Sequence, residues 1–222
     1  MPLFEVRRGL GAGFGSNGTP AARLTTMGEL VTVDFITAAL LDGRGYQVRA
    51  GTIVTGLAAD TPLADTAAEM CADAVAGTTI IPVHFGIAVT GVATATTLQI
   101  AVKAVGTVSS AGTAFTPLPL KQDGAAAVST ARVQATGAVT VTAELATTTR
   151  RLFEFTDVTT QTPTTIGNAQ ALVTVAGSAA DFRYIGVGPV CVYVQVASTT
   201  AQTLYYATLD YLEFPTLLVN PS

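Results

Sequence analysis

Hydrophobic residues recur at every second position along much of the chain. Between residues 97 and 105, four apolar side chains alternate with Gln99 and Lys103, and similar alternation runs through 29–36 and 138–145. A two-residue period is typical of β-strands with one buried face, and the abundant valine and threonine suit a pleated surface. The pattern predicts an all-β protein.

The two most apolar segments are residues 190–197 and 204–214. In the first, valines occupy one face, while the other face carries Cys191, Tyr193 and further uncharged residues. Strands that are apolar on both faces are expected in the middle of a sheet whose outer face is also covered. We therefore expect an antiparallel β-sandwich, with neighbouring subunits covering its outer faces.

Strand pairing is predicted from turns. Residues 127–135 and 138–146 are expected to form a hairpin. Residues 66–76 fit two interpretations: Thr66 and Glu69 match a helix capping box, but the segment leads directly into a strand, and the strand is favoured. Long loops are expected at 56–66, 106–125 and 156–168.

Residues 1–25 differ from the rest of the chain. A short apolar start leads into a glycine-rich stretch between Gly9 and Gly18, where the backbone entropy opposes regular structure. We expect an extended N-terminal arm at 1–25, followed by a single β-sandwich domain at 26–222.

The chain is 12% charged and 49% hydrophobic, whereas about 25% charged residues is usual for a soluble domain. Such a low charge suggests that much of the surface is pressed against other subunits. The net charge of −4 and the presence of only two lysines argue against nucleic acid as a partner. No apolar run is long enough to cross a membrane, so no membrane partner is expected.

Cys71 and Cys191 are the only cysteines. One bridge is possible, but two buried free thiols fit better, because free cysteine packs as a small apolar residue. The N-terminus shows no basic region followed by an apolar run, so we expect synthesis in a reducing cytoplasm.

The residue types needed for catalysis do not assemble in a recognised pattern. Residues 13–18 match G-x-G-x-x-G, but no helix pattern follows, and a flexible arm explains the glycines better. His84 is the only histidine, without partners at metal-ligand or triad spacing. The loose acidic cluster Asp60, Asp65, Glu69 and Asp73 matches no known cation loop and is expected to be solvated. We expect no enzyme activity, no metal and no cofactor.

Two stretches, 75–83 and 190–215, resemble segments of the jelly-roll decoration (cement) proteins of tailed bacteriophages. The resemblance implies a jelly roll that trimerises on the outside of an icosahedral head and clamps major capsid protein subunits, with an extended arm suited to that clamping. It implies a virion location after synthesis in the host cytoplasm.

On this interpretation the chain is a capsid decoration protein that forms a homo-oligomer, a trimer. The residues expected at its interfaces are Phe4, Arg7, Arg8, Phe14, Arg150, Arg151, Tyr193, Tyr205, Tyr206 and Tyr211. Tyrosines are common at interfaces, although core packing explains the late tyrosines equally well. The alternatives are a major capsid protein or another jelly-roll virion subunit, or a carbohydrate-binding sandwich of a tail fibre, with tyrosines as its platform.

Overall fold

The computed structural model describes most of the chain in eight stretches. These are residues 35–52, 55–60, 64–92, 96–134, 138–159, 173–178, 184–198 and 203–219. The predicted arm at 1–25 lies outside the described residues, and so do four of the predicted interface residues, Phe4, Arg7, Arg8 and Phe14.

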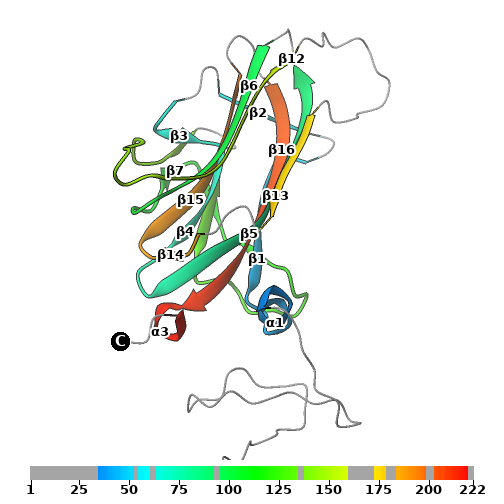
Figure 1. The fold of residues 1–222 in the computed structure, drawn as a ribbon. Coiled ribbons are helices and arrows are strands. Elements are labelled where there is room, and N and C mark those ends of the chain that lie inside the picture. Colours follow the sequence, from blue (N-terminus) through cyan, green and yellow to red (C-terminus); the bar gives the residue numbers. More distant parts are fainter. Residues whose placement is uncertain are drawn as a thin grey trace, which may run out of the picture.

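Eight principal strands form two antiparallel sheets (Figure 1). The first sheet contains β1 (Gly45–Ala50), β5 (Thr78–Val92), β13 (Val173–Ser178) and β16 (Thr203–Pro215). The second sheet contains β4 (Met70–Ala74), β6 (Thr96–Val105), β12 (Arg150–Thr159) and β15 (Val190–Ser198).

The order of these strands defines the topology. Neighbours follow the orders β1–β16–β5–β13 and β4–β15–β6–β12. Numbered along the chain, the eight strands lie 1-8-3-6 in one sheet and 2-7-4-5 in the other, which is the connectivity of a jelly roll. The predicted all-β antiparallel sandwich is confirmed.

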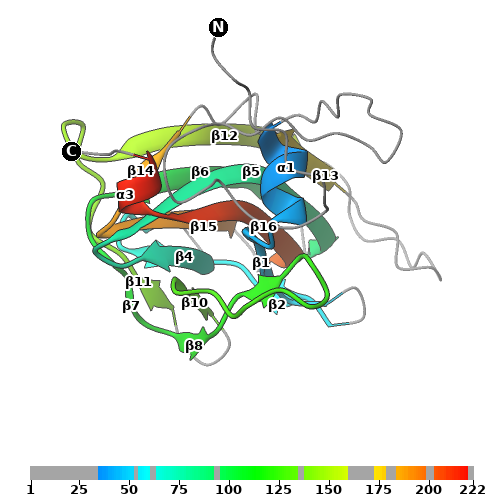
Figure 2. The same cartoon turned by 90° about the horizontal axis from the view of Figure 1, so that it is seen from below.

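Shorter strands extend these sheets and build a third. The first sheet gains β9 (Leu118–Pro119) beside β1, β2 (Leu57–Ala58) beside β16, and β14 (Gly186–Val187) beside β5. The second sheet continues into β10 (Thr130–Val133) and β8 (Thr113–Phe115). The third sheet contains β3 (Ala67–Ala68), β11 (Val139–Thr140) and β7 (Ser110–Ala111). Two helices, α1 (Phe35–Leu41) and α3 (Thr216–Val219), lie at one end of the sandwich (Figures 1 and 2).

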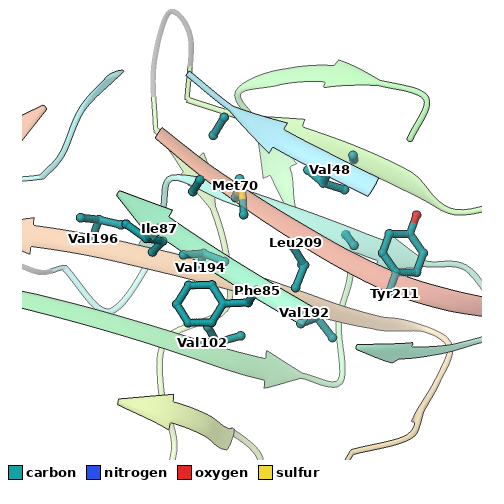
Figure 3. Close-up of a cluster of buried hydrophobic side chains, with 14 of the residues drawn as sticks. Val48, Met70, Phe85, Ile87, Val102, Val192, Val194, Val196, Leu209 and Tyr211 are labelled. Atoms are coloured by element: carbon teal, nitrogen blue, oxygen red, sulfur yellow. The ribbon is translucent and has the colours of Figure 1, made fainter. Parts of the chain in front are cut away.

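Apolar side chains fill the space between the two main sheets (Figure 3). Phe85 and Leu209 from the first sheet pack with Val102 and Val192 from the second, and all four are buried. The ring of Phe153 lies against Phe85, with 5.1 Å between their centroids. The alternation predicted for 97–105 therefore places its apolar face in this core.

The outer face of β15 is covered by the chain itself. Cys191 and Tyr193 pack against Ala68, Val139 and Val141, which belong to the third sheet and the segment that follows it. The prediction of a central strand buried on both faces is confirmed. The expectation that other subunits supply the cover is wrong here, because the segment between β6 and β12 folds back over the sheet.

The outer face of β16 is covered by α1 only at its end near Leu212 and Phe214, whereas Tyr206, Thr208 and Asp210 on the same face are half-buried. Leu212 and Phe214 form a small buried cluster with Ala39, and Phe35 stacks on Phe214 with 5.7 Å between ring centroids. The strand predicted for 29–36 is therefore wrong from Phe35 onward, where a helix begins. Phe35 and Ala39 lie one helical turn apart, so a helix directs both towards the same strand.

The predicted hairpin between 127–135 and 138–146 does not form. β10 pairs with β4 and β8, whereas β11 pairs with β3 and β7. Val139 and Val141 are buried and Thr140 is exposed, so the alternation is real although the strand is short. Alternation reports which side chains are buried but does not identify the neighbouring strand, and here Val139 is used to cover Tyr193.

Residues 66–76 adopt the favoured strand conformation. They form β3 and β4, and Gly77 takes a φ of 87° in the turn that leads to β5. The loop expected at 106–125 contains β7, β8 and β9, and β12 extends through 156–159, where a loop was expected.

Candidate functional site

Three of the four tyrosines predicted at an interface lie inside the protein. Tyr193, Tyr205 and Tyr211 are at most 1% exposed, and burial raises the pKa of each phenol. The hydroxyl of Tyr211 forms a hydrogen bond of 2.6 Å with Ser129 Oγ. Their assignment to an interface is corrected, because the sandwich core and the third sheet cover them. Tyr206 is half-buried and remains accessible.

Arg150 and Arg151 remain exposed at the start of β12. Arg151 is held by Glu144 and by Glu154, which lies 3.1 Å from its Nη1. Glu144 also accepts a hydrogen bond of 2.5 Å from the buried Lys103 Nζ. The hydrogen bond from Lys103, with the one from Arg151, lowers the pKa of the Glu144 carboxyl. Glu144 is therefore a paired carboxylate at neutral pH and is unsuited to act as a general acid.

A hollow of about 430 Å³ opens beside this ion-pair network. Its lining consists of Asp65, Glu144, Ala146, Thr149 and Arg151. Because Glu144 and Arg151 are already paired with each other, the hollow offers a polar surface rather than an activated nucleophile or base.

His84 lies on the surface of the first sheet. Its Nδ1 is 3.3 Å from Asp210 Oδ2, and Asp210 also accepts a hydrogen bond of 2.8 Å from Gln47. This ion pair joins neighbouring positions of β5 and β16 across the sheet.

The acidic residues predicted as a loose solvated cluster occupy three different environments. Asp65 is exposed beside the hollow and Asp60 is half-buried, while Glu69 and Asp73 are buried. Burial, followed by repulsion from Asp60, raises the pKa of Glu69 well above its ordinary value. Glu69 Oε2 accepts a hydrogen bond of 2.8 Å from Val196 N, so this residue fastens β15 rather than facing solvent.

Several large exposed hydrophobic residues belong to elements at the end of the sandwich that carries α1 and α3 (Figure 1). We call this the helix-end surface, and it comprises Phe35, Val75, Ile185, Val187 and Leu217. Backbone hydrogen bonds fasten β14 and α3 to the start of β5: Gly188 N donates to Thr78 O and Thr216 N donates to Gly77 O, both at 2.8 Å. Leu217 is 75% exposed, the largest exposed fraction among these residues. We take these residues as the candidate interaction surface of the described part of the chain.

Sequence reasoning missed the helix-end surface. Its members come from α1, α3, β14 and the turn after β4, which are distant in the chain. Each contributes only one or two apolar residues, so no local run signals the surface. The exposed Val187, in a very short strand beside a buried glycine, gives no periodic signal.

Within the described stretches, no helix has the length and apolar character needed to span a membrane. Comparisons with protein-family models, with curated proteins and with solved structures found no match to this chain.

Proposed function

We propose that the chain is a non-catalytic virion structural protein that decorates an icosahedral capsid. In this role it forms a homotrimer and binds the major capsid protein. The observation that carries the proposal is a jelly roll with a filled interior and an apolar surface at one end.

Jelly rolls are found in viral capsid proteins, lectins and cupins. A fold that holds a ligand between its sheets needs an open or polar interior, whereas Phe85, Val102 and Leu209 fill this one. The activity is therefore expected on the outside of the protein. The paired state of Glu144 and the surface position of His84 favour a structural role over a catalytic one.

The helix-end surface is the part of the protein that we assign to the major capsid protein. The chain enters the sandwich there, because α1 begins at Phe35, and the preceding sequence contains the predicted arm. A partner that contacts this end is therefore within reach of the arm. Apolar contact supplies about 25 cal/mol for each Å² removed from water, and capsid symmetry repeats the contact many times.

The oligomeric state is tested by light scattering during size-exclusion chromatography at micromolar concentration. We expect a mass of three times 22.6 kDa. A single species at 22.6 kDa would contradict the proposed trimer.

The location is tested by electron cryomicroscopy of the virus particle that contains this chain. We expect the sandwich on the outer surface of the head, with its helix end towards the shell. Density within the continuous shell would support the alternative of a capsid subunit, and density on a tail fibre would support the adhesive alternative; either result rejects the proposal.

Attachment is tested by adding purified chain to particles stripped of it. Val187→Asp with Leu217→Asp should abolish binding while the circular dichroism spectrum stays unchanged. The matched control is Leu145→Asp, which alters a residue about as exposed as Val187 in the segment between β11 and β12 and should bind normally. Normal binding by the Val187/Leu217 variant would contradict the assignment of this surface.

The carbohydrate-binding alternative relied on exposed tyrosines. Of the five late tyrosines, Tyr193, Tyr205 and Tyr211 are buried, whereas Tyr184 and Tyr206 are partly exposed. A glycan array in which Tyr206→Ala removes specific binding would favour this alternative.

A further inference from the structure

Two thiols and a carboxylate converge on the outer face of the second sheet. Cys71 and Asp73 lie on β4, and Cys191 lies on β15. One ligand atom from each residue lies within 4.8 Å of the others, and all three side chains are buried. Both cysteines are free, as favoured from the sequence.

Strand register explains why these residues meet. Cys71 is opposite Tyr193 and Cys191 is opposite Asp73, so the two thiols are diagonal neighbours on one face. Diagonal residues in antiparallel strands have Cα atoms about 7–8 Å apart, whereas disulfides usually need about 4.4–6.8 Å. The register therefore disfavours a direct bridge. A metal ion can join the thiolates instead, because each zinc–sulfur bond adds about 2.3 Å.

The carboxylate is already oriented towards the thiols. Ser109 N donates to Asp73 Oδ1 at 2.8 Å, and Ser109 Oγ donates to Asp73 Oδ2 at 2.5 Å. The same Ser109 Oγ lies 3.0 Å from Cys71 Sγ. Such outer hydrogen bonds fix ligand orientation in metal sites, and Ser109 supplies two of them to Asp73.

Arg132 places a positive charge beside the carboxylate. Its Nε lies 3.9 Å from Asp73 Oδ2, and it is buried without a hydrogen-bond partner. Two thiolates and one carboxylate carry three negative charges, which a divalent cation and the Arg132 guanidinium balance. A buried charge cluster is tolerated when it is neutral overall and paired.

We propose that Cys71, Asp73 and Cys191 bind one thiophilic divalent cation of the zinc class. Binding forms two metal–sulfur bonds and one metal–oxygen bond, and it releases one proton from each thiol to solvent without any redox change. The ion joins β4 to β15, and Asp73 holds the segment at Ser109, which leads into β7, through two hydrogen bonds. It therefore fixes the third sheet to the sandwich. This structural role is independent of the proposed virion function.

The sequence predicted no metal because His84 has no partner at ligand spacing and the acidic cluster that includes Asp73 matches no known cation loop. The ligands instead come from strands that are far apart in the chain and adjacent only in the folded sheet. Thiolate and carboxylate ligands together favour zinc over calcium or magnesium, which bind oxygen ligands.

The first test measures zinc in the full-length protein, expressed in zinc-supplemented medium and purified with a reductant and without chelator. We expect about one zinc per chain by mass spectrometry of the metal, as for a single site with three or four ligands. Cys71→Ser and Cys191→Ser should each reduce the zinc content at least tenfold. His84→Ala is the matched control and should retain the wild-type zinc content, because His84 lies on the other sheet.

The second test does not require a folded variant. Full-length wild-type protein is refolded from denaturant with Co²⁺ under anaerobic, reducing conditions, and thiolate-to-cobalt charge-transfer absorption is recorded. One equivalent of Co²⁺ should saturate this band, and Zn²⁺ should displace it. A refolded wild type that shows no such band, or holds no more zinc than the double Cys71→Ser/Cys191→Ser variant, overturns the proposal. Loss of zinc in His84→Ala would also overturn it.

Discussion

The chain covers the outer faces of its two central strands in different ways. Over β16 the cover is a helix, and the contact is apolar: Ala39 packs on Leu212 and Phe214. Over β15 the cover is the segment between β6 and β12, which we call the inserted segment, together with the third sheet. Here apolar contacts are combined with buried polar residues such as Asp73 and Lys103. Polar residues specify position through directional hydrogen bonds, whereas apolar contact mainly supplies free energy. The inserted segment is therefore expected to be the more precisely placed and the more sensitive to single polar substitutions.

The largest effect is expected from Tyr193→Ala, which empties the space beneath the inserted segment. Tyr193 is fully buried, and aromatic-to-alanine changes in cores cost about 3–5 kcal/mol of the free energy of unfolding. Urea denaturation measures this loss. Tyr206→Ala, at a half-buried position on β16, is the control and should cost clearly less; equal losses would show that the inserted segment is loosely packed.

The next effect is expected from Asp73→Ala, measured by urea denaturation in the presence of a chelator. The substitution leaves Ser109 N and Ser109 Oγ buried without their acceptor, and each unsatisfied group costs about 1–3 kcal/mol. Asp65→Ala, at an exposed position, is the control and should change stability little. If the two variants are equally stable, the polar residues beneath the inserted segment do not determine its stability.

A pH-dependent effect is expected from Glu69, which fastens β15 through Val196 N. Burial raises the pKa of Glu69 in the folded state above its ordinary value of 4.5, so the folded protein retains a proton that the unfolded chain loses. The stabilisation of the folded state by this retained proton is fully present below pH 4.5, and it is lost as the pH rises through the raised pKa of Glu69. Within that window the slope is about 1.4 kcal/mol per pH unit.

Denaturation series from pH 4 to pH 9 compare wild type with Glu69→Gln. The glutamine keeps an acceptor for Val196 N but cannot ionise, so its stability curve should be flatter with increasing pH. Identical curves would show that ionisation of Glu69 does not contribute to the pH dependence of stability.

The smallest effect is expected on the helix side. Phe35→Ala removes the stacking on Phe214, and an aromatic pair contributes about 0.5–1.5 kcal/mol beyond its buried area. Leu41→Ala, an exposed position of the same helix, is the control. A loss from Phe35→Ala as large as that from Tyr193→Ala would mean that the two covers are equally important.

The sequence was informative where a strand was long and its pattern complete. The strands at 97–105, 190–197 and 204–214 were predicted because each carries at least four apolar residues at alternate positions. The helix at Phe35 was missed because its seven residues follow a segment with alternating apolar residues, and a short apolar run fits both periods. The pairing of β10 and β11 was missed because register and neighbours depend on tertiary contacts.

Long-range side-chain clusters were beyond the sequence signal for the same reason. Nothing local connects Cys71 with Cys191, or Lys103 with Glu144, until β4, β6 and β15 are aligned. The burial of the tyrosines was similarly undecided from sequence, because a tyrosine on an apolar strand suits both a core and an interface.

The inserted segment begins after β6 and ends at β12, and Ala104 and Arg150 are paired at that point. Both ends are thus tethered at neighbouring positions. A protease that cleaves the segment once would produce two fragments held together by the strand pairing of β6 and β12. The nicked protein should therefore elute from a size-exclusion column with the uncut protein until it is denatured. The same arrangement makes an exposed tip of this segment a suitable place to insert a foreign peptide for display, because the added loop would begin and end outside the jelly-roll framework.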